Sequence, residues 1–238
     1  MFTGIVQGQA SVVALRDLPG LRSLDLAFAP GFCSGLEIGA SVACDGVCLT
    51  VTRLLDTRTA SFDVMQQTLD LTTLGDLAPG SVLNVERAAR EGAEIGGHPL
   101  SGHVDCTGTL ASVARPANNH VLRIAVPPQW MAYLFSKGYV AVNGASLTIA
   151  QADHLAGWFE VWLIPETLRM TTFGHKKAGD RLNIEIERAT QVIVDSVRAQ
   201  IDTVLSARLA QWQAEMHRQL REEIRAELRG ELSGKPRH

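Results

Sequence analysis

The chain has 238 residues, enough for two domains of about 100 residues each and a tail. Apolar residues make up 46% and charged residues 20%, as in ordinary soluble globular proteins, and the net charge of −3 argues against nucleic acid or anionic membranes as partners. The sequence has no run of about 18 apolar residues and does not begin with the pattern of a signal peptide, so we expect no membrane span and a cytoplasmic location.

The first half of the chain consists of short β-rich runs separated by turn residues. Asp45-Gly46 lies between two such runs and predicts a tight hairpin, because both turn positions favour residues that tolerate positive φ. We expect Cys44 beside this turn to be buried rather than bound to a metal, since no CxxC pair or HxxxH motif accompanies it. The predicted strands cover residues 11–15, 23–29, 41–44, 48–55, 60–65 and 82–87.

The second half repeats the first. Residues 137–150, KGYVAVNGASLTIA, match residues 39–52, GASVACDGVCLTVT, at an offset of 98 residues, and Asn143-Gly144 takes the place of the first turn. Three further pairs keep the same order: FTGIV with LSGHV, QTLDLTTLG with ETLRMTTFG, and VLNVE with RLNIE. A repeat of this length indicates a duplicated domain rather than a solenoid. The predicted strands of this half cover residues 120–127, 139–142, 146–150, 158–164 and 181–187.

Several short strands at regular spacing favour closed barrels, since closure removes unpaired strand edges. We therefore predict a mainly β protein with two similar six-stranded antiparallel β-barrels, over residues 1–97 and 98–189, followed by a long C-terminal α-helix and tail over residues 190–238. In that last segment apolar residues recur in steps of three and four from Val197 to Leu228. A helix of about 40 residues spans about 60 Å, more than two small barrels cover. Either it associates with copies of itself, which we favour, or its distal end projects.

These repeats resemble riboflavin synthase. The resemblance is carried by MFTGIVQG, GASVACDGVCLTVT, NVERA, IGGHPLSGHVD, NGASLTI and LIPETLRMTTFG, in the order found in that family. It implies that two molecules of 6,7-dimethyl-8-ribityllumazine give riboflavin and 5-amino-6-(D-ribitylamino)uracil by transfer of a four-carbon unit, without a metal or redox cofactor. It also implies a homotrimer held by the C-terminal helices, with each active site between the N-terminal barrel of one subunit and the C-terminal barrel of a neighbour. An association with lumazine synthase is a further partner that it suggests.

The resemblance places four residues in the chemistry, namely His103, Cys48, Ser146 and Glu187. An imidazole suits proton exchange at neutral pH, and His103 stands where the first half has Ile5. Cys48 is matched by Ser146 in the repeat, and its thiolate would be a strong nucleophile; a role in positioning a water or a ribityl hydroxyl remains open. Glu187 stands where the family commonly has Asp, a carboxylate that orients the hydrogen-bond network of the site.

Ten further residues are expected to contact the substrates by the same resemblance. Thr50 and Thr148 each follow the matched Cys/Ser pair by two positions, and side chains two apart on a strand share a face. Glu166 belongs to IPETL, and Gln67 stands at the equivalent position of the first half, where many relatives have Glu. His98 is expected to be structural or hydrogen-bonding. The full set of expected substrate contacts is Phe2, Thr3, Gly4, Thr50, Gln67, Thr68, Thr148, Ile164, Glu166 and Thr167.

Three functions fit this sequence. An active riboflavin synthase is favoured because Cys48, His103 and the IPETL segment are all present. A non-catalytic lumazine or flavin carrier on the same fold is the second, and loss of those residues would have favoured it. The third is a scaffold whose long helix is an interaction arm, since a fold does not by itself determine a function.

Overall fold

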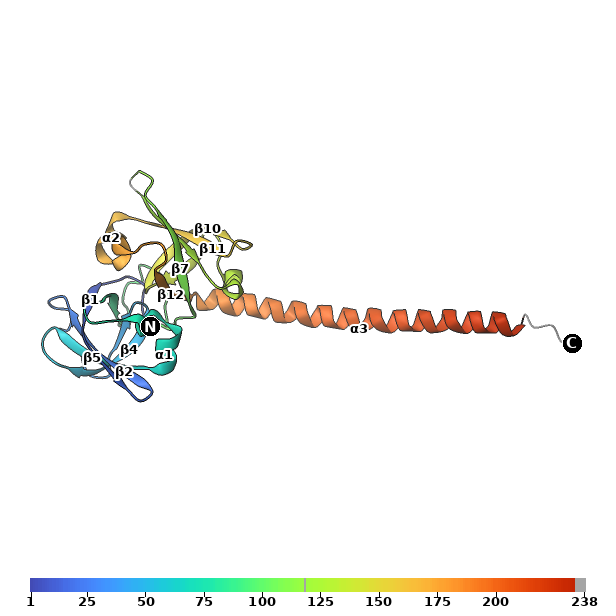
Figure 1. The fold of residues 1–238 in the computed structure, drawn as a ribbon, viewed down its shortest axis with the longest axis horizontal. Helices are drawn as coiled ribbons and strands as arrows, with labels where there is room; N and C mark the ends of the chain where they lie inside the picture. Colours follow the sequence, from blue (N-terminus) through green and yellow to red (C-terminus); the bar gives the residue numbers. More distant parts are fainter. Residues whose placement is uncertain (118, 234–238) are drawn as a thin grey trace. The chain divides into compact units, whose positions relative to one another are not determined.

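The first six strands form a closed antiparallel barrel in the order β1-β2-β5-β4-β3-β6 (Figure 1). The structure is a computed structural model that describes residues 1–117 and 119–233, so residues 234–238 of the predicted tail lie outside the described part. The strands are β1 (Gly8–Leu18), β2 (Leu21–Phe28), β3 (Ser41–Cys44), β4 (Val47–Leu54), β5 (Thr59–Met65) and β6 (Val82–Arg87). Helix α1 (Gln66–Leu71) and the 3₁₀ turn η1 (Thr73–Asp76) connect β5 to β6.

The next six strands close into a second barrel with the same order of equivalent strands, β10-β11-β8-β7-β12-β9. They are β7 (Cys106–Ala114), β8 (His120–Ala125), β9 (Tyr139–Val142), β10 (Ala145–Asp153), β11 (Trp158–Leu163) and β12 (Arg181–Ile186), with η2 (Pro128–Tyr133), α2 (Pro165–Met170) and η3 (Thr172–His175) between them. The predicted pair of six-stranded barrels is confirmed. Strand β7 was missed as an individual element, although the repeat offset carries the predicted strand 11–15 onto residues 109–113.

Each barrel has an apolar interior, and the polar residues of interest lie on the outside. On β4 the buried Val47, Leu49 and Val51 alternate with the half-buried Cys48 and the exposed Thr50, because successive side chains on a strand point to opposite faces. β10 repeats this alternation. The interior is therefore a packed core, and any substrate that meets these polar residues does so on the outer surface of the barrel.

The two barrels join at their hairpin turns. Asp45 and Asn143 have φ of 44° and 43°, and both are followed by a glycine with positive φ, as the hairpin prediction requires. A Cβ atom on Gly46 would lie 2.7 Å from the backbone nitrogen of Gly144, so the two turns are in direct contact and both positions need glycine.

Buried asparagines on β6 and β12 link the barrels reciprocally. The Nδ2 of Asn84 donates to the carbonyl of Asn143 at 3.0 Å, and the Nδ2 of Asn183 donates to the carbonyl of Asp45 at 2.9 Å. Each Oδ1 accepts an N–H from a 3₁₀ turn of the other repeat at 2.8 Å. These buried polar groups are thus paired across the interface, and the pairing follows the approximate twofold relation of the repeats.

Helix α3 (Arg188–Ser233) begins two residues before the predicted start and runs without interruption. Residues 1–191 form one compact unit, and α3 from Val192 onward belongs to a second. The predicted apolar stripe on the helix is exposed; the exposed fraction is 54% for Leu209, 60% for Trp212 and 54% for Leu220. Within the described residues, no helix is both long enough and apolar enough to cross a membrane.

Candidate active site

Each repeat has an extended segment that crosses to the barrel of the other repeat. We call residues 2–6 the first arm and residues 100–104 the second arm; the β-bridge between Phe2 and Leu100 joins them, with hydrogen bonds of 2.8 and 2.9 Å. The carbonyl of Gly4 accepts the N–H of Ser146 on β10, and the carbonyl of Gly102 accepts the N–H of Cys48 on β4, both at 2.8 Å. Each arm therefore lies on the matched Cys/Ser strand of the other repeat.

Glycine is required at both crossing points. A Cβ atom on Gly4 would lie 2.5 Å from the Cβ of Ser146, and one on Gly102 would lie 2.6 Å from the Cβ of Cys48. Both glycines also have positive φ, 75° and 77°. The close approach brings His103, the residue after Gly102, to the outer face of the first barrel next to the Cys48 strand.

A buried glutamate of the same repeat holds each arm. Glu86 accepts hydrogen bonds from the N–H and Oγ1 of Thr3 and from the N–H of Gly4, at 2.6, 2.7 and 3.0 Å. Glu185 accepts the same three bonds from Ser101 and Gly102, at 2.8, 2.6 and 3.1 Å. Burial raises the pKa of both carboxyls, and the hydrogen bonds from the arms act in the opposite direction.

The second barrel has a cavity of about 300 Å³ under the first arm. The structure brings together there five residues that the sequence predicted as site residues, Gly4, Ser146, Ile164, Glu166 and Thr167. Further lining comes from Ile5, Val6, Ala145, Met170 and Thr171. The exposed carboxylate of Glu166 pairs with Arg169, 2.8 Å from Nε to Oε2, and this hydrogen bond lowers its pKa. Sequence reasoning missed Arg169, although its i+3 spacing from Glu166 was a signal.

Every lining residue of this cavity has an equivalent at the first barrel, with the roles of the two repeats exchanged. The second arm supplies Gly102, His103 and Val104, and β4 supplies Val47 and Cys48. The end of β5, α1 and the residue after α1 supply Met65, Gln67, Thr68, Leu71 and Thr72. The imidazole of His103 is exposed, Cys48 and Thr68 are half-buried, and Gln67 is exposed. Thr50 and Thr148 are exposed on the outer faces of β4 and β10.

Ser146 has a histidine partner. Its Oγ lies 2.6 Å from Nδ1 of His98, whose buried ring stacks on Tyr139 with centroids 5.3 Å apart. Burial lowers the pKa of His98, whereas the charge of Glu187 raises it, so the neutral imidazole that can accept the serine hydroxyl is favoured. The hydrogen-bonding role expected for His98 is confirmed.

Three predicted site residues have mainly structural contacts in the structure. Phe2 is 1% exposed, and the Oγ1 of Thr3 donates to the carboxylate of Glu86, so both side chains help to hold the first arm in place. Glu187 directly precedes α3, where its carboxylate accepts the Oγ1 of Thr190 at 2.6 Å. Substrate contact by Phe2 and Thr3, and catalysis by Glu187, stay predictions. Among the described residues, no group of three His, Cys, Asp or Glu side chains is arranged to hold a metal ion.

Comparison with known proteins gives a consistent result. The model of the lumazine binding domain matches the chain twice, over residues 3–88 and 101–187. The riboflavin synthase of Escherichia coli (strain K12) is 45% identical over 209 residues, which is 87% of this chain and 95% of that protein. That of Mycobacterium tuberculosis (strain H37Rv) is 39% identical over 202 residues, 84% of this chain and 99% of that protein.

Solved structures share the fold. LumP complexed with riboflavin has a TM-score of 0.72 at 23% identity, and LumP complexed with 6,7-dimethyl-8-(1'-D-ribityl) lumazine has 0.71 at 21% identity. Each comparison covers 79% of this chain and 100% of the other. At this level of identity the likeness establishes the two-barrel architecture.

Proposed function

The chain belongs to the riboflavin synthase family, and on that premise we propose that it converts two molecules of 6,7-dimethyl-8-ribityllumazine into riboflavin and 5-amino-6-(D-ribitylamino)uracil. A four-carbon unit passes from one lumazine to the other, and the two products together hold all the atoms of two substrate molecules. The observation that carries the proposal is the cavity at the second barrel together with the matching set of residues at the first, each beside the arm of the other repeat.

Differences between the matched positions suit a reaction in which two identical molecules take different roles. The first barrel has Cys48 and receives His103 from the second arm, whereas the second barrel has Ser146 and receives Ile5 from the first arm. One lumazine therefore meets a thiol and an imidazole, and the other meets a hydroxyl that is bonded to His98. This asymmetry supports one donor site and one acceptor site.

His103 is assigned to proton transfer at the C7 methyl group of one lumazine. The electron-poor ring delocalises the resulting carbanion, so the protein's contribution is to place a base and to orient the ring. An imidazole is the side chain best suited to proton exchange at neutral pH. The exposed side chain on the outer face of the first barrel is accessible to a substrate lying there.

Cys48 and Ser146 are assigned to the addition step and to holding the rings. Cys48 either adds to a lumazine as a thiolate or positions a water or ribityl hydroxyl that does so. The Oγ of Ser146, hydrogen-bonded to a buried neutral imidazole, can pass its proton to His98 as it approaches an electrophilic carbon. Glu187 favours the protonated form of His98 electrostatically and so supports that transfer.

Assembly completes the proposal. The exposed stripe on α3 supports association with copies of the chain, and we carry over from the family a homotrimer in which each site combines an N-terminal and a C-terminal barrel of neighbouring subunits. Association with lumazine synthase and a cytoplasmic location are part of the same proposal.

Incubation of the purified protein with 6,7-dimethyl-8-ribityllumazine alone tests the activity. We expect riboflavin absorbance to rise and chromatography to show both products in equal amounts. The variant His154→Ala, which changes an exposed histidine in the β10–β11 turn, is the matched control and should behave as wild type. Tight binding of the lumazine without riboflavin formation would favour the carrier instead.

A further inference from the structure

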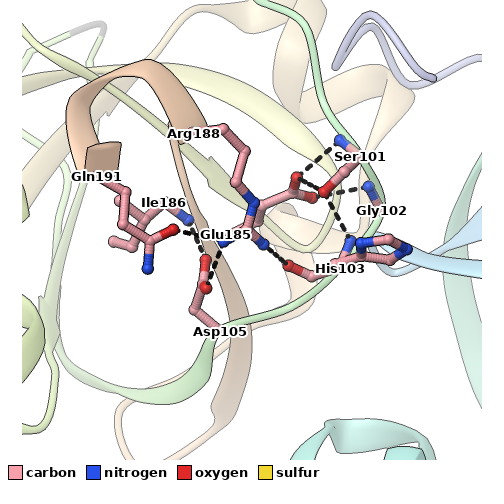
Figure 2. A network of polar contacts seen from close by, with 8 residues as sticks. All are labelled: Ser101, Gly102, His103, Asp105, Glu185, Ile186, Arg188 and Gln191. Atoms are coloured by element: carbon pink, nitrogen blue, oxygen red, sulfur yellow. Dashed lines mark hydrogen bonds and ion pairs between the residues drawn. The ribbon is translucent and has the colours of Figure 1, made fainter. Parts of the chain in front are cut away.

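The second arm is held on both sides of the residue that carries the imidazole. On one side Glu185 binds Ser101 and Gly102; on the other, Nη2 of Arg188 donates to the carbonyl oxygen of His103 at 2.7 Å (Figure 2). The hydroxyl of Ser101 also accepts the N–H of His103 at 3.3 Å. Figure 2 shows the imidazole turned away from the carboxylate of Glu185. The backbone of His103 is therefore fixed while its side chain remains available.

The guanidinium of Arg188 is itself fixed by two acceptors. Its Nη1 donates to Oδ1 of Asp105 at 2.8 Å and to Oε1 of Gln191 at 2.5 Å. The other carboxylate oxygen of Asp105 accepts the N–H of Ile186 at 2.7 Å, so this carboxylate connects the arm to the end of β12. The exposed fraction is 8% for the Asp105 side chain and 41% for Arg188. A planar guanidinium with several donors suits such a bridge better than an ammonium.

The first repeat serves as an internal comparison for this arrangement. It keeps the glutamate that binds the arm, in Glu86, but Ala89 stands in the place of Arg188 and cannot donate to the carbonyl of Ile5. Gln7 stands in the place of Asp105, and its Oε1 accepts only the backbone N–H of Arg87 among the described contacts, at 3.1 Å. Ala89 instead lines a cavity of about 560 Å³ beside the first arm. The guanidinium clamp thus occurs in the repeat that carries His103, and the repeat with Ile5 has an alanine there.

We propose that Arg188, paired with Asp105, is a positioning residue for His103. The glutamate present in both repeats binds the arm to its barrel, and the arginine adds a second restraint that only the proton-transferring residue requires. Because Arg188 is the first residue of α3, the restraint ties the active site to the start of this helix. This inference rests on the proposed function, since it assigns no chemistry of its own to Arg188.

The variant Arg188→Ala tests the proposal. It leaves the carbonyl of His103 without this donor and Asp105 without its cation, so the arm should sample more conformations. We expect kcat to fall about 10-fold, because a misplacement of about 1 Å can cost up to about 10²-fold, while KM changes less than about twofold. Arg188→Lys keeps the charge opposite Asp105 but has a single nitrogen for the three acceptors, and should recover part of kcat.

A double-mutant cycle separates positioning from general destabilisation. In the His103→Ala background, Arg188→Ala should have no further effect on kcat, because the residue that it positions is gone. Arg16→Ala is the matched control; it breaks an ion pair with Asp25 of nearly the same exposure, 44% and 8%, and should leave kcat unchanged.

Either of two results would overturn the role of Arg188. One is an unchanged kcat in Arg188→Ala, and the other is the same loss of kcat with and without His103. A wild-type protein that forms no riboflavin would overturn the proposed function itself, and the positioning role with it. Wild-type activity together with an unaffected Arg188→Ala variant removes only the positioning role.

Discussion

Replacing Asp45 by asparagine should remove a pH-dependent loss of stability from the first barrel. The side chain lies in the turn that contacts the second barrel, is 3% exposed, and accepts the N–H of Asn84 at 2.8 Å. Burial raises the pKa of this carboxyl from 3.8 to about 6, and the hydrogen bond from Asn84 and the charge of Lys176 only partly oppose the effect. The equivalent residue of the second repeat, Asn143, cannot ionise.

The size of the effect follows from the two pKa values. The folded protein holds the proton of Asp45 more tightly than the unfolded chain does, so unfolding free energy is lost as the pH rises. The loss is small below about pH 4 and nearly complete above about pH 6. A pKa of 3.8 in the unfolded chain and about 6 in the folded protein corresponds to a total of about 3 kcal/mol. Asp45→Asn should lack this contribution at every pH.

Urea unfolding of both proteins from pH 4 to pH 7.5, at one protein concentration, measures the effect. The unfolding free energy of Asp45→Asn minus that of wild type should rise by about 2.5 kcal/mol over this range, since about 0.5 kcal/mol of the total is already lost at pH 4. The amide that Asp45→Asn introduces should also cost a pH-independent amount, because the equivalent Nδ2 of Asn143 has no hydrogen-bond partner within the described residues. This cost is the same at every pH and so cancels when the stability difference is compared between pH values. The reverse exchange, Asn143→Asp, should give the second barrel the same pH dependence. A difference that stays constant within about 1 kcal/mol would refute the reasoning.

Three further predictions concern the site and the helix. His103→Ala should lower kcat by at least about 10²-fold, the usual effect of a proton-transfer group, and a near-wild-type rate would remove His103 from the mechanism. Glu187→Gln removes a negative charge that raises the pKa of His98, so the ¹H NMR titration midpoint of His98 should fall; an unchanged or higher midpoint would contradict the assigned electrostatics. A chain that ends at Gln191 keeps the compact unit of both barrels and should be monomeric by light scattering, whereas a surviving trimer would exclude α3 as the assembly element.

The internal repeat made most of the fold predictable. Two matched turns, Asp45-Gly46 and Asn143-Gly144, fixed the hairpins, and alternation along the strands indicated which residues face outward. Strand β7 was missed because Gly, Ala and Ser in CTGTLASVA form strands weakly. Only its position in the repeat indicated a strand there. The short helices α1 and α2 were also missed, since six residues hold too few turns for a helical pattern.

The contacts of the site were less predictable, for physical reasons that particular residues illustrate. The pairing of His98 with Ser146 joins residues 48 positions apart, and no local sequence pattern connects them. The hydrogen bond from Cys48 to Gly102 depends on how two barrels pack, which strand periodicity does not contain. Arg188 lies within the predicted second barrel, two residues before the predicted helix, and no sequence pattern indicates its contact with His103, which depends on where the arm lies.

Because each arm crosses to the other barrel, the unit that forms a pocket differs from the unit that is repeated in the sequence. By sequence His103 belongs to the second repeat, and the predicted boundary after residue 97 assigns it to the second barrel. Its neighbour Gly102 nevertheless bonds to Cys48 of the first barrel, just as Gly4 bonds to Ser146 of the second. Each pocket position is therefore built from both repeats, and a single barrel cut at the boundary would have a Cys or Ser strand without its arm. Because each arm is fixed to its own barrel by a buried glutamate, the divergence of one arm alters the chemistry over the other barrel. Substitution of one residue in an arm, isoleucine in one repeat and histidine in the other, is thus sufficient to make the two surfaces chemically unequal while both barrels keep the same fold.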